Sequence, residues 1–386
     1  MLKLCYDTLA LRNVGYPNLA SGQAKPYTNE WYQFDNRYPR VVPLRLLLYT
    51  QDYSVSTFEH LSTKAWYPIG LGWFDFEFDY FSAIPCLDRV RQKLLKVLFY
   101  YHEGDNPFRI KERLDTLVSK NNLPHDCYIF ISANTQASKI KNFIYFPDHE
   151  FFFRYINRNQ VNTDLVHELK HDFTVLSRLP KWWRASIISD LFSNQLLTSS
   201  LLSYNTANEN IDNEADNPIE LDIVPGWREN ARWITYCKFK CDNLSHNDHN
   251  NHGVVNTYLY TATKCSIVLE THFDVDQSNG AFLTEKTFKP IKFGQPFVVA
   301  GGPGSLQALR DSGYRVFDSI IDNEYDTILD NTKRYLALRG SLIKIQANKQ
   351  FYQECLSDVL HNQKIFNDRA TAPVNNLLKE LECLLQ

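Results

Sequence analysis

Between Ser266 and Phe317 the chain alternates short apolar runs with helix-like stretches, and no other part of the sequence restricts the fold as strongly. The runs SIVLE and PFVVA have the length of buried strands, and a third strand is predicted to open at Arg315. Thr284 is a suitable N-cap for the first intervening helix, and Gly294 is a suitable stop. This strand–helix alternation predicts a doubly wound α/β unit of the nucleotide-binding kind.

The upstream sequence shows a second region of the same character. Apolar strands are predicted at residues 41–49, 96–101, 127–132, 143–146 and 173–176, and helices at 108–121 and 185–197. The aromatic stretch 65–80 contains Pro and Gly and is predicted to pack as an ordered loop. A length of 386 residues suits two domains. The expected division is 1–170, 171–345 and a helical tail over 346–386.

Composition excludes several classes of protein. Lys and Arg total 41 against 44 Asp and Glu, a net charge of -3, so bulk binding of nucleic acid or anionic membrane is disfavoured. No apolar run approaches the roughly 20 residues that span a bilayer. The N-terminus lacks the apolar region of a signal peptide, and the eight Cys are scattered, which indicates reduced thiols. A cytoplasmic protein without a membrane span is therefore expected.

The densest group of chemically useful residues opens the predicted helix at Thr284. A helix N-terminus favours anions, because its N–H groups and its dipole point toward the ligand. Lys286, Lys289 and Lys292 recur every three residues and reinforce that field. Glu285, in the first turn, is able to accept two hydrogen bonds from the hydroxyls of a ribose. A solvated lysine face with a Glu near the cap is the simpler structural interpretation of the same residues.

The block Thr284–Pro296, followed by Gly301-Gly302-Pro303-Gly304-Ser305, resembles the donor-binding half of GT-B glycosyltransferases. The match is closest to fucosyltransferase-like proteins and to phage and large-virus glycosyltransferases with a TEKTFKPI-type block. The resemblance covers Ser266 to Asp326 well. It implies two Rossmann-like domains facing a cleft, with the nucleotide-sugar on the C-terminal domain and the acceptor on the N-terminal one.

The resemblance also implies roles for residues of this chain. In such enzymes the Glu of the Glu-Lys pair binds ribose, and a nearby basic residue binds phosphate. The basic turn before the helix at 185–197 offers Arg178, Lys181 and Arg184, and Trp182 or Trp183 is placed to stack on a base. The expected donor-binding residues are Arg178, Lys181, Thr284, Glu285, Lys286, Lys289, Gly302 and Ser305. The expected donor is a GDP- or UDP-sugar, with no metal or other cofactor required.

Inverting glycosyl transfer needs a general base for the acceptor hydroxyl. His102, Glu103 and Asp105 follow the predicted strand at 96–101, in a turn sharpened by Gly104 and Pro107. Glu103 is the first candidate for the catalytic base and Asp105 the second. Three competing carboxylates lie in the aromatic stretch upstream: Asp75, Glu77 and Asp79.

Other interpretations remain open. Asp274-Val275-Asp276 is a DxD sequence, which would suit a metal-dependent GT-A-type transferase. A non-catalytic module that binds a glycan or a protein through its aromatic N-terminal half is a further alternative. The turn at Gly301–Ser305 lacks the G-K-[ST] ending of a P-loop and does not match G-x-G-x-x-G, so an ATPase or a dinucleotide oxidoreductase is disfavoured.

A Cys- and His-rich stretch imitates a zinc site, with residues Cys237, Cys241, His246, His249 and His252. Its spacing departs from the usual structural zinc patterns, and its Asn-rich composition favours an exposed loop. The acceptor is expected to be a glycan or another hydroxyl compound. Nucleic acid is not expected as a partner, although modified DNA is left open as an acceptor.

Overall fold

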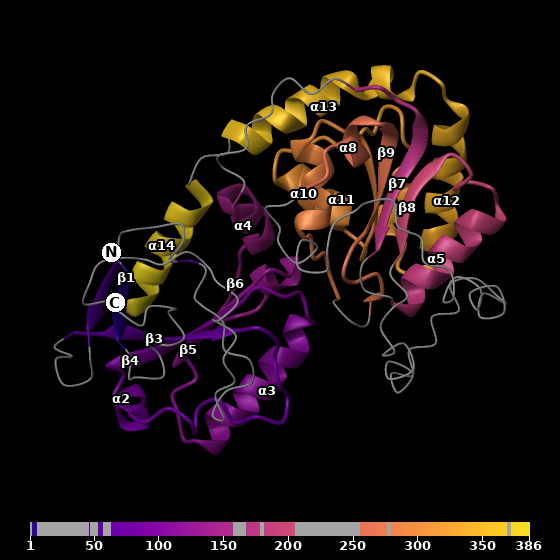
Figure 1. Cartoon of the computed structure of the whole chain (residues 1–386). Coiled ribbons are helices and arrows are strands. Elements are labelled where there is room, and N and C mark those ends of the chain that lie inside the picture. The colour runs from indigo at the N-terminus through magenta and orange to yellow at the C-terminus, as the bar shows by residue number, and fades with distance from the viewer. Residues whose placement is uncertain are drawn as a thin grey trace. The chain divides into compact units, whose positions relative to one another are not determined.

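The computed structural model describes residues 2–5, 46, 53–56, 63–156, 167–177, 181–204, 255–275, 279–368 and 372–386. The chain divides into two compact units, each built around a parallel sheet (Figure 1). Unit 1 consists of Met1–Tyr155 and Ala370–Gln386, and unit 2 of Ile156–Arg369. The strand predicted at 41–49 lies outside the described residues except for Leu46.

The sheet of unit 1 has six strands in the order β2-β1-β3-β4-β5-β6. The strands are β1 (Leu2–Cys5), β2 (Tyr53–Ser56), β3 (Ala65–Leu71), β4 (Leu95–Tyr101), β5 (Tyr128–Ser132) and β6 (Phe143–Tyr145). All the described strand pairs are parallel. β4 and β5 are apolar and almost wholly buried, as parallel strands covered on both faces should be. The predictions for β4, β5 and β6 are therefore confirmed.

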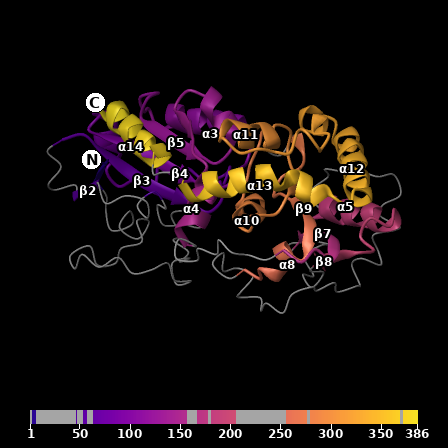
Figure 2. The same cartoon turned by 90° about the horizontal axis from the view of Figure 1, so that it is seen from above.

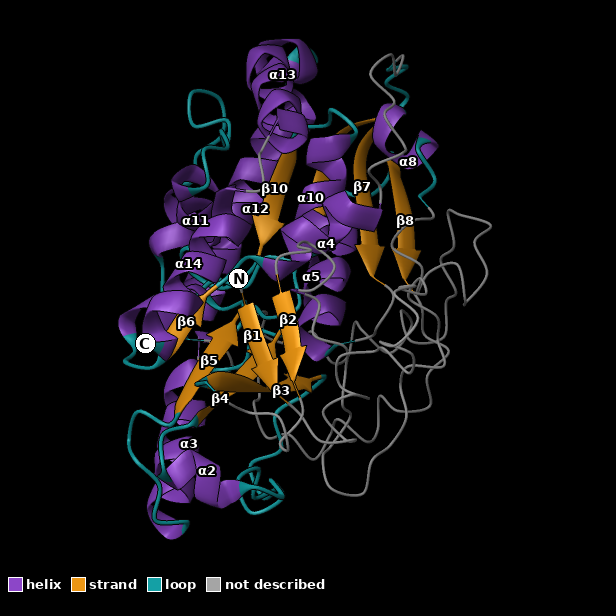
Figure 3. Cartoon of the chain, turned by 90° about the vertical axis from the view of Figure 1, so that its left-hand side faces the viewer, coloured by secondary structure: helices purple, strands orange, loops and turns teal. Residues whose placement is uncertain are grey.

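Helices cover both faces of this sheet. They are α2 (Leu87–Arg91), α3 (Pro107–Lys120), the 3₁₀ turn η5 (Thr135–Lys139), α4 (Asp148–Ile156) and α14 (Ala372–Leu385). Figures 1 and 3 show α14 on one face and α2 with α3 on the other. α3 begins one residue before the predicted start at 108, because Asn106 caps the amide of Phe108 at 3.0 Å and Pro107 occupies the first helical position.

The sheet of unit 2 has four described strands in the order β10-β9-β7-β8. They are β7 (His171–Ser177), β8 (Ser200–Tyr204), β9 (Thr263–Leu269) and β10 (Phe297–Ala300), and all their pairs are parallel. The chain adds β8 on one side of β7 and then β9 and β10 on the other. The order therefore reverses between β7 and β9, which makes their carboxyl ends a topological switch point.

The described helices of unit 2 flank this sheet. They are α5 (Trp182–Ser193), α8 (Tyr258–Thr261), α10 (Glu285–Lys292), α11 (Ser305–Asp311), the 3₁₀ turn η8 (Glu324–Thr327), α12 (Asn331–Ala347) and α13 (Phe351–Asp368). Figures 1 and 2 show α10 and α11 on one face and α5 and α12 on the other. Asp190 of α5 joins α5 to α12 by accepting hydrogen bonds from Tyr335 and Arg339 of α12.

The prediction of a loop over 65–80 is wrong for its first part. Ala65–Leu71 forms β3, a fully buried strand inside the sheet that pairs with β4 along its whole length. Pro68 and Gly70 are disfavoured within a central strand, which is why the sequence favoured a loop. The seven buried side chains of AWYPIGL outweigh that preference.

The strand predicted from Arg315 to Phe317 is also not formed. The amide of Arg315 donates to Asn362 Oδ1 at 2.7 Å, and its carbonyl accepts from Asn362 Nδ2 at 2.8 Å. The side chain of Asn362, on α13, therefore takes both backbone groups that a neighbouring strand would use. Phe317 then has φ 63°, in the left-handed region, which turns the chain away from an extended course.

The C-terminal residues divide between the two units. Residues of α13 pack in unit 2, whereas α14 returns to unit 1 and completes its core. The buried residues of α14 in that core are Val374, Leu377, Leu381 and Leu385. Residues 346–386 thus do not form a separate body, because their apolar faces are buried in two different cores. Both units are α/β, with parallel sheets of Rossmann-like character.

Candidate functional site

The carboxyl ends of β7 and β9 lie side by side at the switch point of unit 2. In open parallel sheets, ligands bind outside the carboxyl ends of the strands at such a point. β7 leads into α5 at Lys181, and β9 leads into Glu270 and Thr271. The residues there form the best candidate site within the described chain.

Glu270 anchors this site, although it is fully buried. Its Oε1 accepts from the amide of Thr284 at 2.9 Å and from Thr287 Oγ1 at 2.6 Å. Its Oε2 accepts from Thr284 Oγ1 at 2.7 Å and from the amide of Thr271 at 3.2 Å. A buried carboxylate is tolerated when donors satisfy it in this way. Glu270 thereby fixes the first turn of α10 against the end of β9.

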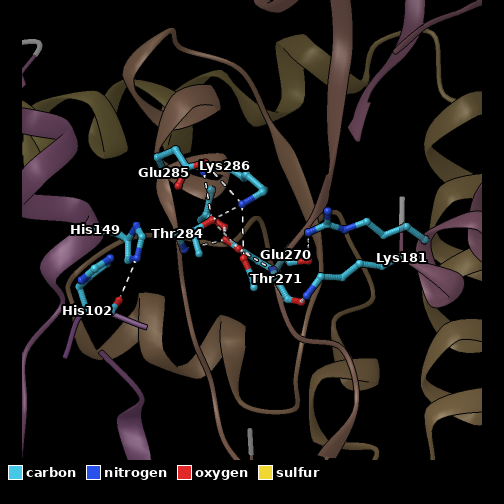
Figure 4. A network of polar contacts seen from close by, with 10 residues as sticks. His102, His149, Lys181, Glu270, Thr271, Thr284, Glu285 and Lys286 are labelled. Carbon is cyan, nitrogen blue, oxygen red and sulfur yellow. Dashed lines mark hydrogen bonds and ion pairs between the residues drawn. The ribbon is translucent and has the colours of Figure 1, made fainter. Parts of the chain in front are cut away.

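Three cations converge on the segment Glu270–Thr271 (Figure 4). Lys181 Nζ donates to the carbonyl of Thr271 at 3.0 Å, and Arg184 Nη2 donates to the carbonyl of Glu270 at 2.6 Å. Lys286 Nζ lies 3.0 Å from Thr284 Oγ1 and 3.4 Å from Thr271 Oγ1. The β7–α5 junction and the start of α10 thus bring their positive charges to one place.

Glu285 and Lys286 occupy the first turn of α10, as predicted, with Thr284 as the N-cap. Their side chains are 14% and 29% exposed, so they are partly covered and still open to a ligand. Lys286 Nζ lies 3.4 Å from Glu285 Oε1. The site therefore combines a carboxylate acceptor with a neighbouring cation at a helix N-terminus, which is suitable for a sugar hydroxyl beside an anion.

The three lysines of α10 do not share one environment. Lys289 is half-buried in the middle of the helix, and Lys292 is buried in its last turn. Lys292 Nζ lies 5.3 Å from the centre of the Phe293 ring, and burial lowers its pKa to about 8. Only Lys286 stands at the helix N-terminus, so the predicted reinforcement by all three lysines does not hold there.

The glycine-rich turn after β10 lies beside Glu270. A Cβ on Gly301 would stand 2.8 Å from Ser305 Oγ, which is too close without a shift, and 3.5 Å from the Cβ of Glu270, which is an ordinary contact. Ser305 Oγ is buried and donates to the carbonyl of Gly302 at 2.6 Å. The predicted donor-binding residues Gly302 and Ser305 are therefore near the site, with the Ser305 hydroxyl engaged inside the turn.

The N-terminus of α11 is occupied by a carboxylate of the same chain. Asp326 accepts from the amides of Leu306 at 3.0 Å and Gln307 at 3.1 Å. Burial raises the pKa of Asp326, and the hydrogen bonds from these amides oppose the rise. Asp326 thus holds two amides of the first turn of α11, whereas the carboxylate beside α10, Glu270, bonds to the cap residue Thr284.

The other residues predicted to contact the donor are Arg178, Trp182 and Trp183. Arg178 lies outside the described residues, and so does the side chain of Trp182. Trp183 is 3% exposed and stacks on Phe273 with the ring centres 5.3 Å apart, so it packs in the core. A base-stacking role for Trp183 is therefore not supported by its position.

Of the two carboxylates in the DxD sequence, which suggested an alternative metal site, the structure describes Asp274. Asp274 is 3% exposed, and its Oδ1 accepts from Asn331 Nδ2 at 3.1 Å. Arg334 stacks over the neighbouring Phe273 at 4.3 Å and bonds to its carbonyl. Asp274 thus belongs to a buried network, while Asp276 lies outside the described residues.

No cluster of His, Cys, Asp or Glu in the described ranges is arranged to hold a metal ion. The Cys- and His-rich stretch, residues 237–252, lies outside those ranges.

In unit 1 the structure separates the two candidates for a general base. Asp105 accepts a hydrogen bond from the buried Tyr101 hydroxyl. Glu103 has a side chain that is 35% exposed, and its Oε1 lies 3.5 Å from Nε2 of the buried His102. Both carboxylates therefore have a local contact, and that of Glu103 is also partly open to solvent.

The competing carboxylates have local structural contacts. Asp75 accepts from the amide of Glu77 at 2.8 Å. Asp79 pairs with Lys120 at 3.0 Å and accepts from Asn121 at 3.1 Å. These contacts shape the loop after β3 and favour structural roles for Asp75 and Asp79.

Sequence reasoning missed Glu270, Thr271 and Thr287 as members of the site. Glu270 closes the apolar run SIVLE, and a carboxylate at the end of a buried strand was the available signal. Its partners were not visible from the sequence, because Thr284 and Thr287 lie beyond a loop whose course was unknown.

Comparison of this chain with known protein families, curated proteins and solved structures gave no match. In the part of the chain that the structure describes, no helix is long and apolar enough to cross a bilayer.

Proposed function

We propose that this chain is a GT-B-type glycosyltransferase that binds a nucleotide-sugar through unit 2. The observation that supports this most directly is the convergence of Lys181, Arg184 and Lys286 on Glu270–Thr271 at the switch point. These cations come from two separate strand–helix junctions, which is the arrangement expected for a bound diphosphate.

The charges of the site favour an anion. Three cations face two carboxylates, Glu270 and Glu285, and the N-terminus of α10 adds positive potential. Glu270 accepts hydrogen bonds from neutral amide and hydroxyl groups only among its printed donors, so the formal charges of these five side chains sum to +1. A diphosphate brings the negative charge that balances it, and Glu285 is placed to accept from ribose hydroxyls.

The proposed reaction needs a base and a stabilised leaving group. The acceptor hydroxyl loses its proton to Glu103 while its oxygen forms a bond to the anomeric carbon of the sugar. The bond from that carbon to the phosphate oxygen breaks, and its electron pair leaves with the nucleoside diphosphate. Lys181, Arg184 and Lys286 stabilise that developing charge, which removes the need for a metal in the proposed mechanism.

Within this proposal the donor is a GDP- or UDP-sugar and the acceptor is a glycan or another hydroxyl compound. The placement of Asp274 in a buried network argues against the metal-dependent alternative that uses Asp274 and Asp276. The inverting outcome rests on the assignment of Glu103 as a base rather than a nucleophile.

A thermal-shift panel of GDP, UDP, CDP and dTDP, each with and without Mn²⁺, tests the donor site. A ligand that binds the folded chain raises the unfolding temperature, and at 100 times its Kd the stabilisation is about 2.7 kcal/mol. The expected result is selective stabilisation by one nucleotide without Mn²⁺, lost in Lys286→Ala and kept in Lys333→Ala. Lys333 is an exposed lysine of α12 and is the matched control.

Absence of any shift with all four nucleotides would contradict the proposal. A shift that requires Mn²⁺ would favour a metal-dependent transferase. Release of nucleoside diphosphate from the matching nucleotide-sugar then distinguishes a transferase from a module that only binds.

A further inference from the structure

The turn that carries Glu103, after β4, is held by a side chain that follows β5 and by one that follows β6. His149 Nε2 lies 2.9 Å from the carbonyl of His102, and Asn134 Nδ2 donates to the carbonyl of Gly104 at 2.9 Å. Figure 4 shows the first of these contacts. The two carbonyls stand immediately before and immediately after Glu103, so both flanking backbone segments are tied down.

Both contacts have a defined chemistry. A carbonyl only accepts hydrogen bonds, so His149 carries a proton on Nε2. Asn134 is fully buried, and its Oδ1 accepts from the amide of Gln136 at 2.9 Å, which leaves Nδ2 as the donor to Gly104. His149 is 9% exposed, so neither contact competes strongly with water.

The elements that bear these two side chains are themselves fixed. Asn134 follows β5 and is the N-cap of η5. His149 lies in the first turn of α4, where the neighbouring Asp148 accepts from the hydroxyl of Tyr100 on β4. The hydrogen bonds from His149 and Asn134, called the clamp below, therefore connect the segments after β5 and β6 to the turn after β4. Both connections are short and buried.

We propose that Asn134 and His149 are positioning residues that hold the backbone on both sides of Glu103 and so orient its carboxylate as the general base. This inference rests on the proposed transferase activity and adds two residues to it. Asp105, the second candidate for the base, accepts a hydrogen bond from the hydroxyl of Tyr101.

The proposed effect is one of orientation. A base must stand within hydrogen-bond reach of the proton it removes, and small displacements reduce the rate by as much as about 100-fold. Loss of either hydrogen bond would leave donor binding intact, because the proposed donor contacts come from unit 2. The change should therefore fall on kcat and leave KM for the donor and the affinity for nucleoside diphosphate unchanged.

The experiment compares His149→Leu with His149→Gln in the full chain. The amide of Gln restores an Nε2 donor at similar reach, whereas Leu fills the space without a donor. His125→Leu is the matched control, because His125 is an exposed histidine of the same unit. The assay is release of nucleoside diphosphate from the nucleotide-sugar identified by the thermal-shift panel, with water as acceptor.

For His149→Leu we expect kcat to fall by about 10- to 100-fold with KM within twofold. His149→Gln is expected to recover kcat to within about threefold of wild type, and His125→Leu to remain unchanged. Hydrogen exchange of a peptide spanning 101–107 should quicken in His149→Leu and return to the wild-type rate in His149→Gln. Asn134→Asp, which removes the donor but keeps Oδ1, is the second variant if His149→Leu does not fold.

If the wild type is active and kcat is unchanged in both His149→Leu and Asn134→Asp, the positioning role of these residues is overturned. The proposed function would still stand in that case. Equal losses in the Leu and Gln variants would assign His149 a structural role and also overturn the positioning role of the clamp. Failure of the wild type to bind any nucleoside diphosphate or release one from a nucleotide-sugar would instead overturn the proposed function, and with it the role of Glu103.

Discussion

Thr284 bonds to both oxygens of the buried Glu270 carboxylate. Its amide donates to Oε1 at 2.9 Å, and its hydroxyl donates to Oε2 at 2.7 Å. One residue therefore fixes the end of β9 to the start of α10 and sets the direction of the helix N-terminus. The geometry of the whole candidate site depends on this pair, since Glu285 and Lys286 follow directly.

The first prediction concerns Glu270→Gln. An amide presents only one acceptor atom, so its NH₂ group would face donors from Thr284, Thr287 or Thr271. The variant should lose about 1–3 kcal/mol of unfolding free energy, because buried donors are left without acceptors. Urea unfolding measures the loss. The exposed Glu324→Gln is the control, and equal stability of wild type and Glu270→Gln would contradict the prediction.

The second prediction concerns Glu285→Ala. If Glu285 binds the ribose, the variant should bind nucleoside diphosphate at least about tenfold more weakly, which is about 1.4 kcal/mol. Calorimetry with inorganic pyrophosphate should show no such loss, because that ligand has no ribose. Lys286→Ala should weaken both ligands, and Glu380→Ala on α14 is the exposed control. Unchanged nucleotide affinity in Glu285→Ala would remove the ribose assignment.

Much of the fold was predictable from local pattern. The helix at Thr284 and its stop at Gly294 were correctly predicted, because a threonine cap and a glycine with φ 67° act within one turn. β4, β5 and β9 each contain a run of apolar residues that was visible in the sequence. The site residues at the start of α10 came from the same local signals.

The rest depended on contacts between distant parts of the sequence. The backbone of Arg315 bonds to the side chain of Asn362, 47 positions later, instead of to a neighbouring strand. The return of α14 to unit 1 is of the same kind, since its partners lie at the beginning of the chain. Neither contact is marked by a local pattern in the sequence, so hydrophobic periodicity could not predict either one.

The third prediction concerns the pH dependence of stability at Lys292. Burial lowers its pKa from 10.5 to about 8, so the folded chain holds this proton less tightly than the unfolded chain. Stability should therefore rise as the pH passes from about 8 toward 10.5, because the unfolded state then binds more protons. Below this range the buried charge opposes folding.

Lys292→Met isolates that contribution. The variant should be more stable than wild type at pH 7, and its advantage should shrink by about 2 kcal/mol by pH 9.5, since one pKa unit is worth about 1.4 kcal/mol. Urea unfolding at both pH values gives the difference. The exposed Lys344→Met is the control for general charge effects, and an advantage that does not change with pH would contradict the pKa shift.

The last prediction concerns the C-terminal helix. Leu381 is fully buried in the core of unit 1, whereas Leu384 on the same helix is only partly buried. Lys96 Nζ donates to the carbonyl of Leu384 at 2.6 Å and so holds the end of α14 to β4. Leu381→Ala should cost about 2–5 kcal/mol of unfolding free energy, because it leaves a cavity in a packed core. Leu384→Ala should cost clearly less, because part of that side chain already meets solvent.

If α14 were a separate tail, the two variants would have similar small effects, and hydrogen exchange in β1 would not change in either. Faster exchange in β1 and β4 for Leu381→Ala, with α10 unaffected, would show that the last helix stabilises unit 1 specifically.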